Sequence, residues 1–275
     1  MRLRPRIGLS LAVSAAVLVC AASAQAIIMR HDRPDSRYRD LGETYRPFLV
    51  QLGLPGADGV RRLYGGMGTL VAPTWVLTAG HTADRFAPSS AYPIDLTSHE
   101  VWVMGRAYRL RSVHLHPDYE RGDADHDIAL LELETAPSDA RVACLYAASD
   151  ERDQEVINVG AGTPGNGVSG VGTPDGALRG ATTLVDRVED DVLIWRFRAP
   201  DDPRATDLHG ISGPGDSGGP ALIVRGDEVC VAGVSGSQRR RPGRAPGTYG
   251  VEEVYARVSS HRDWIISVIG SEPGA

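Results

Sequence analysis

The sequence predicts an all-β protein of the barrel or sandwich class, and three observations support this prediction. Short segments rich in β-branched and apolar residues recur along the chain, separated by turns of Gly, Pro and Asp. A helical pattern of apolar residues is found in one place, near the C-terminus. The chain has 275 residues, of which 42% are hydrophobic and 23% charged, enough to bury the core of one large or two ordinary domains.

The expected elements follow from apolar and β-branched content. Strands are expected at residues 47–52, 67–71, 75–78, 100–104, 107–114, 128–133, 156–159, 182–185, 192–197, 221–224, 229–234 and 254–258. Residues 27–42 are polar and predicted to be irregular, and residues 137–150 are a candidate linker between two halves. The C-terminal helix begins at Ser259 or Ser260 as N-cap and ends at Gly270.

Residues 1–26 have the pattern of a secretory signal peptide. Arg2, Arg4 and Arg6 precede a mainly apolar stretch over residues 7–19, and two Ala-x-Ala sites follow at 22–24 and 24–26. The sequence therefore predicts a secreted or periplasmic protein that has no membrane association once the leader is removed.

Charge and cysteine content narrow the classes of partner. Removal of the leader takes the formal net charge from −6 to −9, which argues against a nucleic-acid partner. Cys144 and Cys230 remain, an even pair in an oxidising compartment; we expect them to form one disulfide, and two separate buried thiols are the alternative. His114 and His116 are the only close histidine pair and are interpreted as loop residues, so we expect no metal and no cofactor.

The stretch 213–220, Gly-Pro-Gly-Asp-Ser-Gly-Gly-Pro, organises the rest of the chain. Six of its eight residues are Gly or Pro, which excludes a helix interior and indicates a tight, rigid loop. This loop holds the hydroxyl of Ser217 beside unobstructed backbone N–H groups, the arrangement that acyl transfer needs for its oxyanion. A surface turn with a solvent-facing serine is the alternative.

Two further polar residues lie at the ends of predicted strands. His81 follows the buried strand 75–78, and Asp127 leads directly into the apolar strand 128–133. A serine hydroxyl needs a base to take its proton, and an imidazole base needs a carboxylate to fix its tautomer. The three residue types together therefore indicate nucleophilic catalysis, although each alone is more often structural.

The chain resembles the chymotrypsin/trypsin-like serine proteases in three blocks. These are Thr78-Ala79-Gly80-His81, Asp127-Ile128-Ala129-Leu130 and the segment 215–220, in the order His, Asp, Ser that this family has. The resemblance covers about residues 47–266. It implies two six-stranded antiparallel β-barrels, over about 47–140 and 141–258, with the active site between them and a C-terminal helix over 259–270.

The resemblance also implies the role of each site residue. Ser217 is the nucleophile, His81 is the general base and then acid, and Asp127 orients His81. The backbone N–H groups of Gly215 and Ser217 form the oxyanion hole. The implied function is a secreted serine endopeptidase, a monomer that acts on a protein or peptide substrate without a cofactor.

Two alternative functions remain open from the sequence. The segment 215–219 also matches the Gly-x-Ser-x-Gly motif of α/β-hydrolase esterases, but that fold requires a helix directly after the serine, and a strand is predicted at 221–224. A catalytically inactive homologue that binds a partner is the second alternative. Such proteins usually lack one of the three catalytic residues, and this chain has them all.

The chain departs from the family pattern at its disulfides and in the specificity pocket. Gly66 and Thr82 stand where the family has a disulfide near the catalytic histidine. Ile211 stands where trypsin-like members have the Asp at the pocket base, which argues against simple cleavage after Arg or Lys. Glu253 falls where a pocket-lining Gly is usual, and it either shortens the pocket, pairs with a basic side chain or points to solvent.

Two remaining expectations concern the substrate backbone and activation. Ser235 and Gly236 lie in the segment expected to pair with the substrate. In this family an Ile-led N-terminus buries its ammonium against the Asp before the nucleophile, here Asp216. Cleavage after residue 26 would release Ile27 directly, whereas cleavage after residue 24 would leave Asp216 with another partner.

Overall fold

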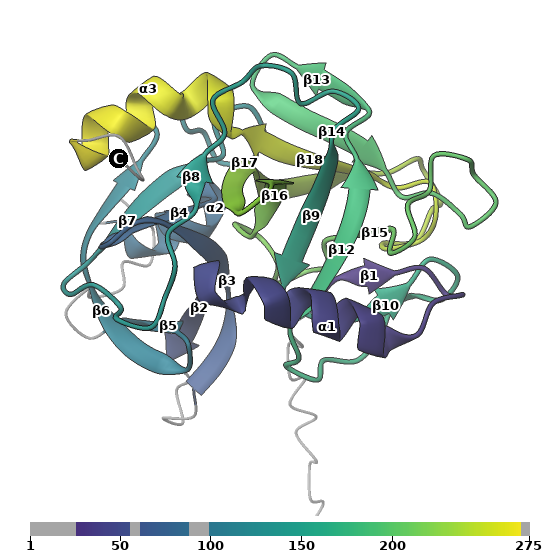
Figure 1. Ribbon diagram of the computed structural model, residues 1–275, viewed down its shortest axis with the longest axis horizontal. Helices are drawn as coiled ribbons and strands as arrows, with labels where there is room; N and C mark the ends of the chain where they lie inside the picture. The colour runs from purple at the N-terminus through teal and green to yellow at the C-terminus, as the bar shows by residue number, and fades with distance from the viewer. Residues whose placement is uncertain (1–25, 56–60, 88–98, 271–275) are drawn as a thin grey trace, which may run out of the picture.

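The computed structural model describes residues 26–55, 61–87 and 99–270, so the predicted leader, except Ala26, lies outside the described residues. The described chain forms two β units that lie side by side (Figure 1). Helix α3 (Val258–Ile269) lies over the first unit, and helix α1 (Asp35–Tyr45) runs along the second. This arrangement confirms the predicted all-β, chymotrypsin-like fold with a C-terminal helix.

The first unit is a closed six-stranded barrel in the order β2-β3-β4-β7-β6-β5. Its strands are β2 (Leu49–Pro55), β3 (Arg61–Ala72), β4 (Trp75–Thr78), β5 (Glu100–Val103), β6 (Arg106–Leu115) and β7 (Ala129–Leu133). Buried aliphatic residues such as Val76, Val101 and Leu131 fill its interior. Met104 and Gly105, both with positive φ, form the two-residue turn between β5 and β6, because such a turn matches the twist of the paired strands.

The second unit is an eight-stranded sheet. Its path runs β12-β9-β16-β17-β18-β14-β13, and β8 pairs with β17 beside that path. The strands are β8 (Cys144–Leu145), β9 (Glu155–Gly160), β12 (Arg179–Leu184), β13 (Arg187–Glu189), β14 (Val192–Arg196), β16 (Pro220–Arg225), β17 (Glu228–Arg239) and β18 (Glu252–Arg257). A small sheet adds β1 (Ile28–Met29), β10 (Gly165–Asn166), β11 (Gly170–Val171) and β15 (Gly210–Ile211).

The two units share one apolar cluster. Met67, Leu77 and Leu130 of the barrel pack in the same cluster as Leu222 and Val234 of the second unit. Burial of apolar area at roughly 25 cal/mol per Å² makes such a shared cluster the main force that fixes the relative position of the units. Loops at the junction are therefore held rigidly.

Helix α1 corrects the prediction that residues 27–42 are irregular. It has only two buried residues, Tyr38 and Gly42, so the sequence lacks the apolar stripe that identifies an amphipathic helix. Gly42 allows the helix to approach β12 closely, because a Cβ there would lie 2.7 Å from the backbone of Arg179. The fully buried guanidinium of Arg179 also pairs with Asp35 in the first helical turn at 2.5 Å. Tertiary contacts, rather than local pattern, form this helix.

The other predicted elements are observed with shifted ends. Each predicted strand overlaps an observed strand, whereas β1, β8, β10, β11, β13 and β15 are too short to show a periodic pattern. The C-terminal helix ends at Gly270 in the left-handed conformation, as expected, with φ of 80°. Its N-cap is Arg257, not Ser259 or Ser260, and it has no side-chain cap.

The predicted disulfide is present. Cys144 in β8 pairs with Cys230 in β17, in direct register across a parallel strand pair. Cys144 lies within the expected linker 137–150, so the bridge ties the connection between the two units to β17 in the middle of the second sheet. Among the described residues, no helix is long and apolar enough to cross a bilayer.

Candidate active site

His81 is held at the junction of the two units by its own backbone and by Asp127. It lies in the short helix α2 (Gly80–Ala83), which follows β4. Gly80 is required there because a Cβ would lie 2.6 Å from the ring of Tyr119. The backbone N–H of His81 donates to Asp127 Oδ1 at 2.7 Å, and Nδ1 lies 2.7 Å from Asp127 Oδ2.

Asp127 is buried immediately before β7, with 4% of its surface exposed. Gly236 lies against it, because a Cβ at that position would be 3.2 Å from Oδ2. The two contacts to His81 fix the carboxylate and place the imidazole proton on Nδ1. Nε2 of His81 is therefore left with a lone pair and can accept a proton.

The loop around Ser217 is as tight as its sequence predicts. Gly215 and Gly218 have φ of 96° and 81°, a conformation that a side chain would strain. The backbone N–H of Met67 donates to the carbonyl of Ser217 at 2.8 Å, and the N–H of Gly218 donates to the carbonyl of Ser235 at 2.8 Å. The loop is thereby bonded to both units, and it leads into strand β16 rather than into a helix, which excludes the α/β-hydrolase motif.

Two backbone N–H groups of this loop are left without an acceptor among the described residues. The N–H groups of Asp216, Gly218 and Gly219 each donate to a backbone carbonyl. Among hydrogen bonds between described residues, none uses the N–H of Gly215 or of Ser217. Two free donors on either side of one residue can bind a negatively charged oxygen.

A cavity of about 360 Å³ opens beside Ser217. It is lined by Ser212, Gly213, Pro214, Ser217, Ser235, Gly236, Ser237, Gln238, Arg240, Pro246 and Glu253. Sequence reasoning identified Ser235, Gly236 and Glu253 in this region but not Ser212, Gln238 or Arg240. Their positions depend on how β15, β17 and the segments that follow these strands fold.

Glu253 is the buried charge of the cavity, with 1% of its surface exposed. Its Oε1 accepts a hydrogen bond from Gln238 Nε2 at 2.7 Å, and its Oε2 accepts one from the N–H of Ser212 at 3.3 Å. Burial raises the pKa of Glu253 to about 8, despite the opposing effect of these hydrogen bonds. The carboxyl therefore changes charge in a physiologically useful range.

Ile211 is packed in the apolar core of the second unit. Its side chain is fully buried, and it pairs with Ile28 between β15 and β1. The residues that line the cavity include its neighbour Ser212 instead. Ile211 therefore contributes to the apolar core behind the cavity.

Asp216 is also buried, and no cationic side chain of the described residues is bonded to it. Its Oδ1 accepts a hydrogen bond from the N–H of Gly162, and its Oδ2 accepts one from the N–H of Gly213, each at 2.9 Å. Burial raises the pKa of Asp216 to about 8. Ile27 is fully buried, in a cluster with Tyr38.

Gly66 and Thr82, which stand where the family has a disulfide near the catalytic histidine, are in contact. A Cβ at Gly66 would lie 2.6 Å from Thr82 Cγ2 and 2.8 Å from the carbonyl oxygen of Ser217. A close Gly–Thr contact therefore occupies the position of the bridge.

A closed β-barrel packed on a second β unit, with His81, Asp127 and Ser217 at their junction, defines a protein of the chymotrypsin-like class. The family model described as Trypsin matches residues 43–265. The chain therefore belongs to the trypsin family of serine proteases. Most of α1 and all of β1 precede the matched region.

Similarity to individual trypsins is distant but extensive. The chain is 29% identical over 232 residues to Trypsin 5G1 of Aedes aegypti, covering 82% of this chain and 80% of that protein. It is 30% identical over 206 residues to a trypsin of Phaedon cochleariae, covering 72% and 76%. A shorter match of 66 residues, 39% identical, to a trypsin of Simulium vittatum covers 24% of this chain and 26% of that protein.

Proposed function

We propose that the chain is a secreted serine endopeptidase that hydrolyses peptide bonds through an acyl-enzyme intermediate. The observation that carries the proposal is the two-point contact of His81 with Asp127, at 2.7 Å each, beside a cavity that Ser217 lines. Membership of the trypsin family supports the same chemistry. The protein acts as a monomer on protein or peptide substrates.

In the first half of the reaction, Ser217 Oγ attacks the carbonyl carbon of the scissile bond while His81 Nε2 takes the hydroxyl proton. Asp127 stabilises the imidazolium that forms. The carbonyl oxygen becomes an oxyanion and accepts hydrogen bonds from the free N–H groups of Gly215 and Ser217. His81 then donates its proton to the leaving amine, and the acyl group stays on Ser217.

In the second half, water replaces the amine. His81 takes a proton from the water as it attacks the acyl carbon, and a second oxyanion forms in the same site. Collapse of this intermediate returns the proton to Ser217 and releases the carboxylic acid.

The cavity binds the side chain that precedes the scissile bond, and Glu253 sets its preference for a basic residue. Its volume of about 360 Å³ is ample for a long side chain. A cation that enters would find in Glu253 a buried carboxylate that lacks a charged partner among its hydrogen-bond donors. Profiling of cleavage sites in a peptide library tests this preference.

Activation uses a new N-terminus at Ile27. The carbonyl oxygen of Ala26 packs so closely against Gly213 that a Cβ on Gly213 would clash with it. The N–H of Gly213 also donates a hydrogen bond to Asp216 Oδ2. An ammonium freed at Ile27 would therefore start close to a buried, unpaired carboxylate. Strand β1 and helix α1 accommodate the additional residues that separate Ile27 from the first barrel.

N-terminal sequencing of the active secreted protein tests this step. A mature chain that begins at Ile27 supports it. A chain that begins at Gln25, or full activity after replacement of Ile27 and Ile28 by Gly with export retained, would contradict it.

The direct test of the function is hydrolysis of a general protein substrate by Ser217→Ala protein. Loss of activity on the order of 10⁴-fold or more is expected, because the three residues act as a unit. Ser237→Ala is the matched control, since Ser237 is exposed and lines the same cavity. A wild-type protein that hydrolyses nothing, yet is folded and correctly processed, would support the inactive binding homologue instead.

A further inference from the structure

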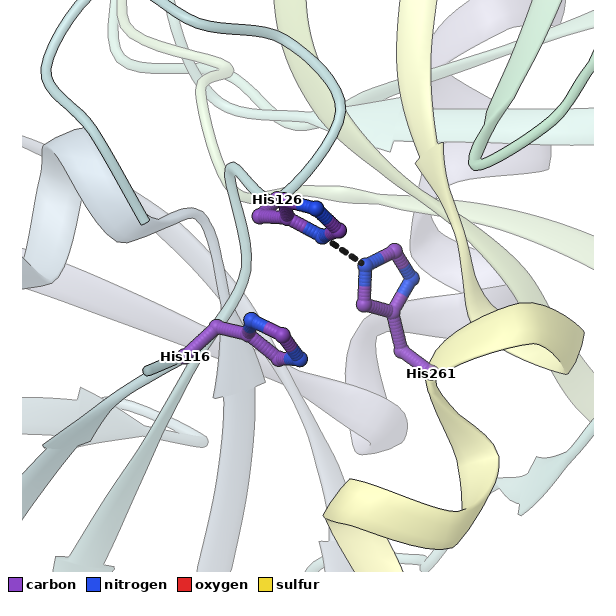
Figure 2. Close-up of side chains that lie close together, drawn as sticks. All are labelled: His116, His126 and His261. Atoms are coloured by element: carbon purple, nitrogen blue, oxygen red, sulfur yellow. Dashed lines mark hydrogen bonds between the residues drawn. The ribbon is translucent and has the colours of Figure 1, made fainter. Parts of the chain in front are cut away.

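Three histidines from distant parts of the sequence meet at the side of the N-terminal barrel. His116 directly follows β6, His126 lies in the loop before β7, and His261 is in the first turns of α3. Figure 2 shows the three rings facing a common space, with His116 and His126 on one side and His261 on the other. Their candidate ligand nitrogens all lie within 4.8 Å of one another.

The distances approach those of a metal site. Nδ1 of His126 lies 3.2 Å from Nε2 of His261. Two nitrogens bound to one tetrahedral Zn²⁺ at 2.0–2.1 Å are about 3.3 Å apart. The rings of His116 and His126 are stacked with centroids 4.8 Å apart and planes at 7°, so the His116 ring must turn out of this stack before its lone pair can point at an ion shared with His126.

The surroundings of His261 orient it as a ligand. Its Nδ1 lies 2.7 Å from the carbonyl oxygen of Arg257, an acceptor that places the ring proton on Nδ1. Nε2 is then unprotonated and faces the other two histidines. Hydrogen bonding of the second ring nitrogen to a backbone carbonyl is the usual support of a metal-bound histidine.

The local charge also favours a cation. The carboxylates of Asp191 and Asp125 act electrostatically on His261 with a cation-stabilising sign. The rings are not exposed surface histidines, because His261 is 3% exposed and the side chain of His116 is 12% exposed.

We propose that His116, His126 and His261 form a binding site for one divalent transition-metal ion of the Zn²⁺ class. Three imidazoles suit Zn²⁺, Cu²⁺, Co²⁺ or Ni²⁺, whereas Ca²⁺ and Mg²⁺ require oxygen ligands. A fourth position is left for water. The cluster of Cys144, Cys230 and Glu228 is not an equivalent site, because its two sulfur atoms are joined in the disulfide.

The position of the site gives the ion a structural consequence. His126 directly precedes Asp127, whose carboxylate contacts His81. Bound metal would join the segment that carries Asp127 to helix α3. It would thereby restrain the geometry of the candidate active site from outside the substrate cavity.

Zinc binding is measured by titration calorimetry and equilibrium dialysis on metal-free Ser217→Ala protein, a background that prevents self-digestion. One Zn²⁺ per chain is expected. A free Zn²⁺ concentration about 100 times the dissociation constant should raise the unfolding midpoint by roughly 5–10 °C.

Two variants remove one ligand each while keeping the hydrogen bond that the ring makes in the metal-free protein. In His261→Asn the side-chain amide can still donate to the Arg257 carbonyl. In His116→Asn the side-chain oxygen can still accept the hydrogen bond that the N–H of Asp118 gives to Nδ1 at 3.2 Å, a bond that His116 gives up when it binds the ion. Each variant should bind Zn²⁺ at least about 100-fold more weakly. His114→Asn is the matched control, two residues away on β6 and outside the cluster, and should bind normally.

Nitrogen-15 spectra of the histidine rings test the site without any change to its residues. Of the eight histidines, Zn²⁺ should shift the ring signals of His116, His126 and His261 first. Absence of stoichiometric binding, unchanged affinity in both Asn variants, or a first shift at His81 instead would overturn the proposal.

Discussion

Replacement of Glu253 by Gln removes the ionisable carboxyl group that lines the substrate cavity, together with the acceptor of the long 3.3 Å hydrogen bond from the Ser212 N–H. Gln has nearly the same size, and its amide oxygen can still accept the hydrogen bond from Gln238 Nε2. The carboxyl of Glu253 has its pKa raised to about 8 by burial. A raised carboxyl pKa means that the group is neutral well below pH 8 and carries its charge above it.

The expected size of the effect follows from this pKa. With a pKa of about 8, Glu253 is mainly neutral at pH 6 and mainly ionised at pH 9. If a cationic substrate side chain binds productively to the ionised form, its kcat/KM relative to an uncharged substrate rises over this range by on the order of 10- to 100-fold. Titration of any group that acts equally on both substrates cancels in the ratio.

The assay uses two peptides that differ only in the residue before the scissile bond, Arg in one and its uncharged analogue citrulline in the other. The ratio of kcat/KM values is measured from pH 6 to pH 9 in wild-type and Glu253→Gln proteins. The wild-type ratio should rise with pH, and the variant ratio should be flat. In the control variant Arg240→Gln, which removes the exposed cation of the cavity, the pH slope should persist.

A flat ratio in the wild-type protein would refute the role of Glu253. An equal rise in the Glu253→Gln protein would refute it as well, because another group would then provide the titrating charge.

Three further predictions concern stability and the nucleophile loop. Replacing Cys144 and Cys230 by Ala opens a bridge across 86 residues, for which chain entropy gives a loss of about 4–5 kcal/mol, measured by urea unfolding of a catalytically inactive variant; a loss below about 1 kcal/mol would contradict it. Gly66→Ala should lower kcat by about 10–100-fold and destabilise by about 1–3 kcal/mol, since its Cβ meets a carbonyl of the nucleophile loop at 2.8 Å. Gly105→Ala has a similar positive φ but open space around it, so kinetics should be unchanged there, and equal activity in both variants would disprove the steric argument. In the unprocessed chain, burial raises the pKa of Asp216 to about 8, whereas in the unfolded chain the group ionises near pH 4, so the free energy of unfolding should fall as pH rises from about 4 to about 8. Denaturant unfolding across this range should show a smaller fall in Asp216→Asn, and an identical fall would contradict the assignment.

The strands and the candidate active site could be predicted because their signals are local. The β-branched segment 75–78 appears as β4 with the same ends, and the Gly-rich loop around Ser217 has the positive φ angles that its composition indicates. His81 follows the end of β4 and Asp127 precedes the start of β7, and the two residues meet because these antiparallel strands are paired neighbours. An even cysteine count was sufficient to predict the disulfide.

Features that depend on distant contacts could not be predicted. Helix α1 has no apolar stripe, and both Gly42 and Asp35 contact Arg179, which is far along the chain. The pairing of Ile211 with Ile28 in the core joins segments 183 residues apart, and no local pattern in the sequence indicates it.

The histidine cluster is a further example of this limit. His126 and His261 are separated by 135 residues, so no spacing motif relates them, and only the packing of α3 on the barrel brings them together.

Covalent labelling of Ser217 tests the central claim most directly. A phosphonylating reagent should add one group per chain, located on Ser217 by peptide mass spectrometry, in step with loss of hydrolysis. His81→Ala protein should react far more slowly, because the hydroxyl then lacks its base. Labelling at another residue, or undiminished hydrolysis by Ser217→Ala protein, would contradict the assignment of Ser217 as the nucleophile.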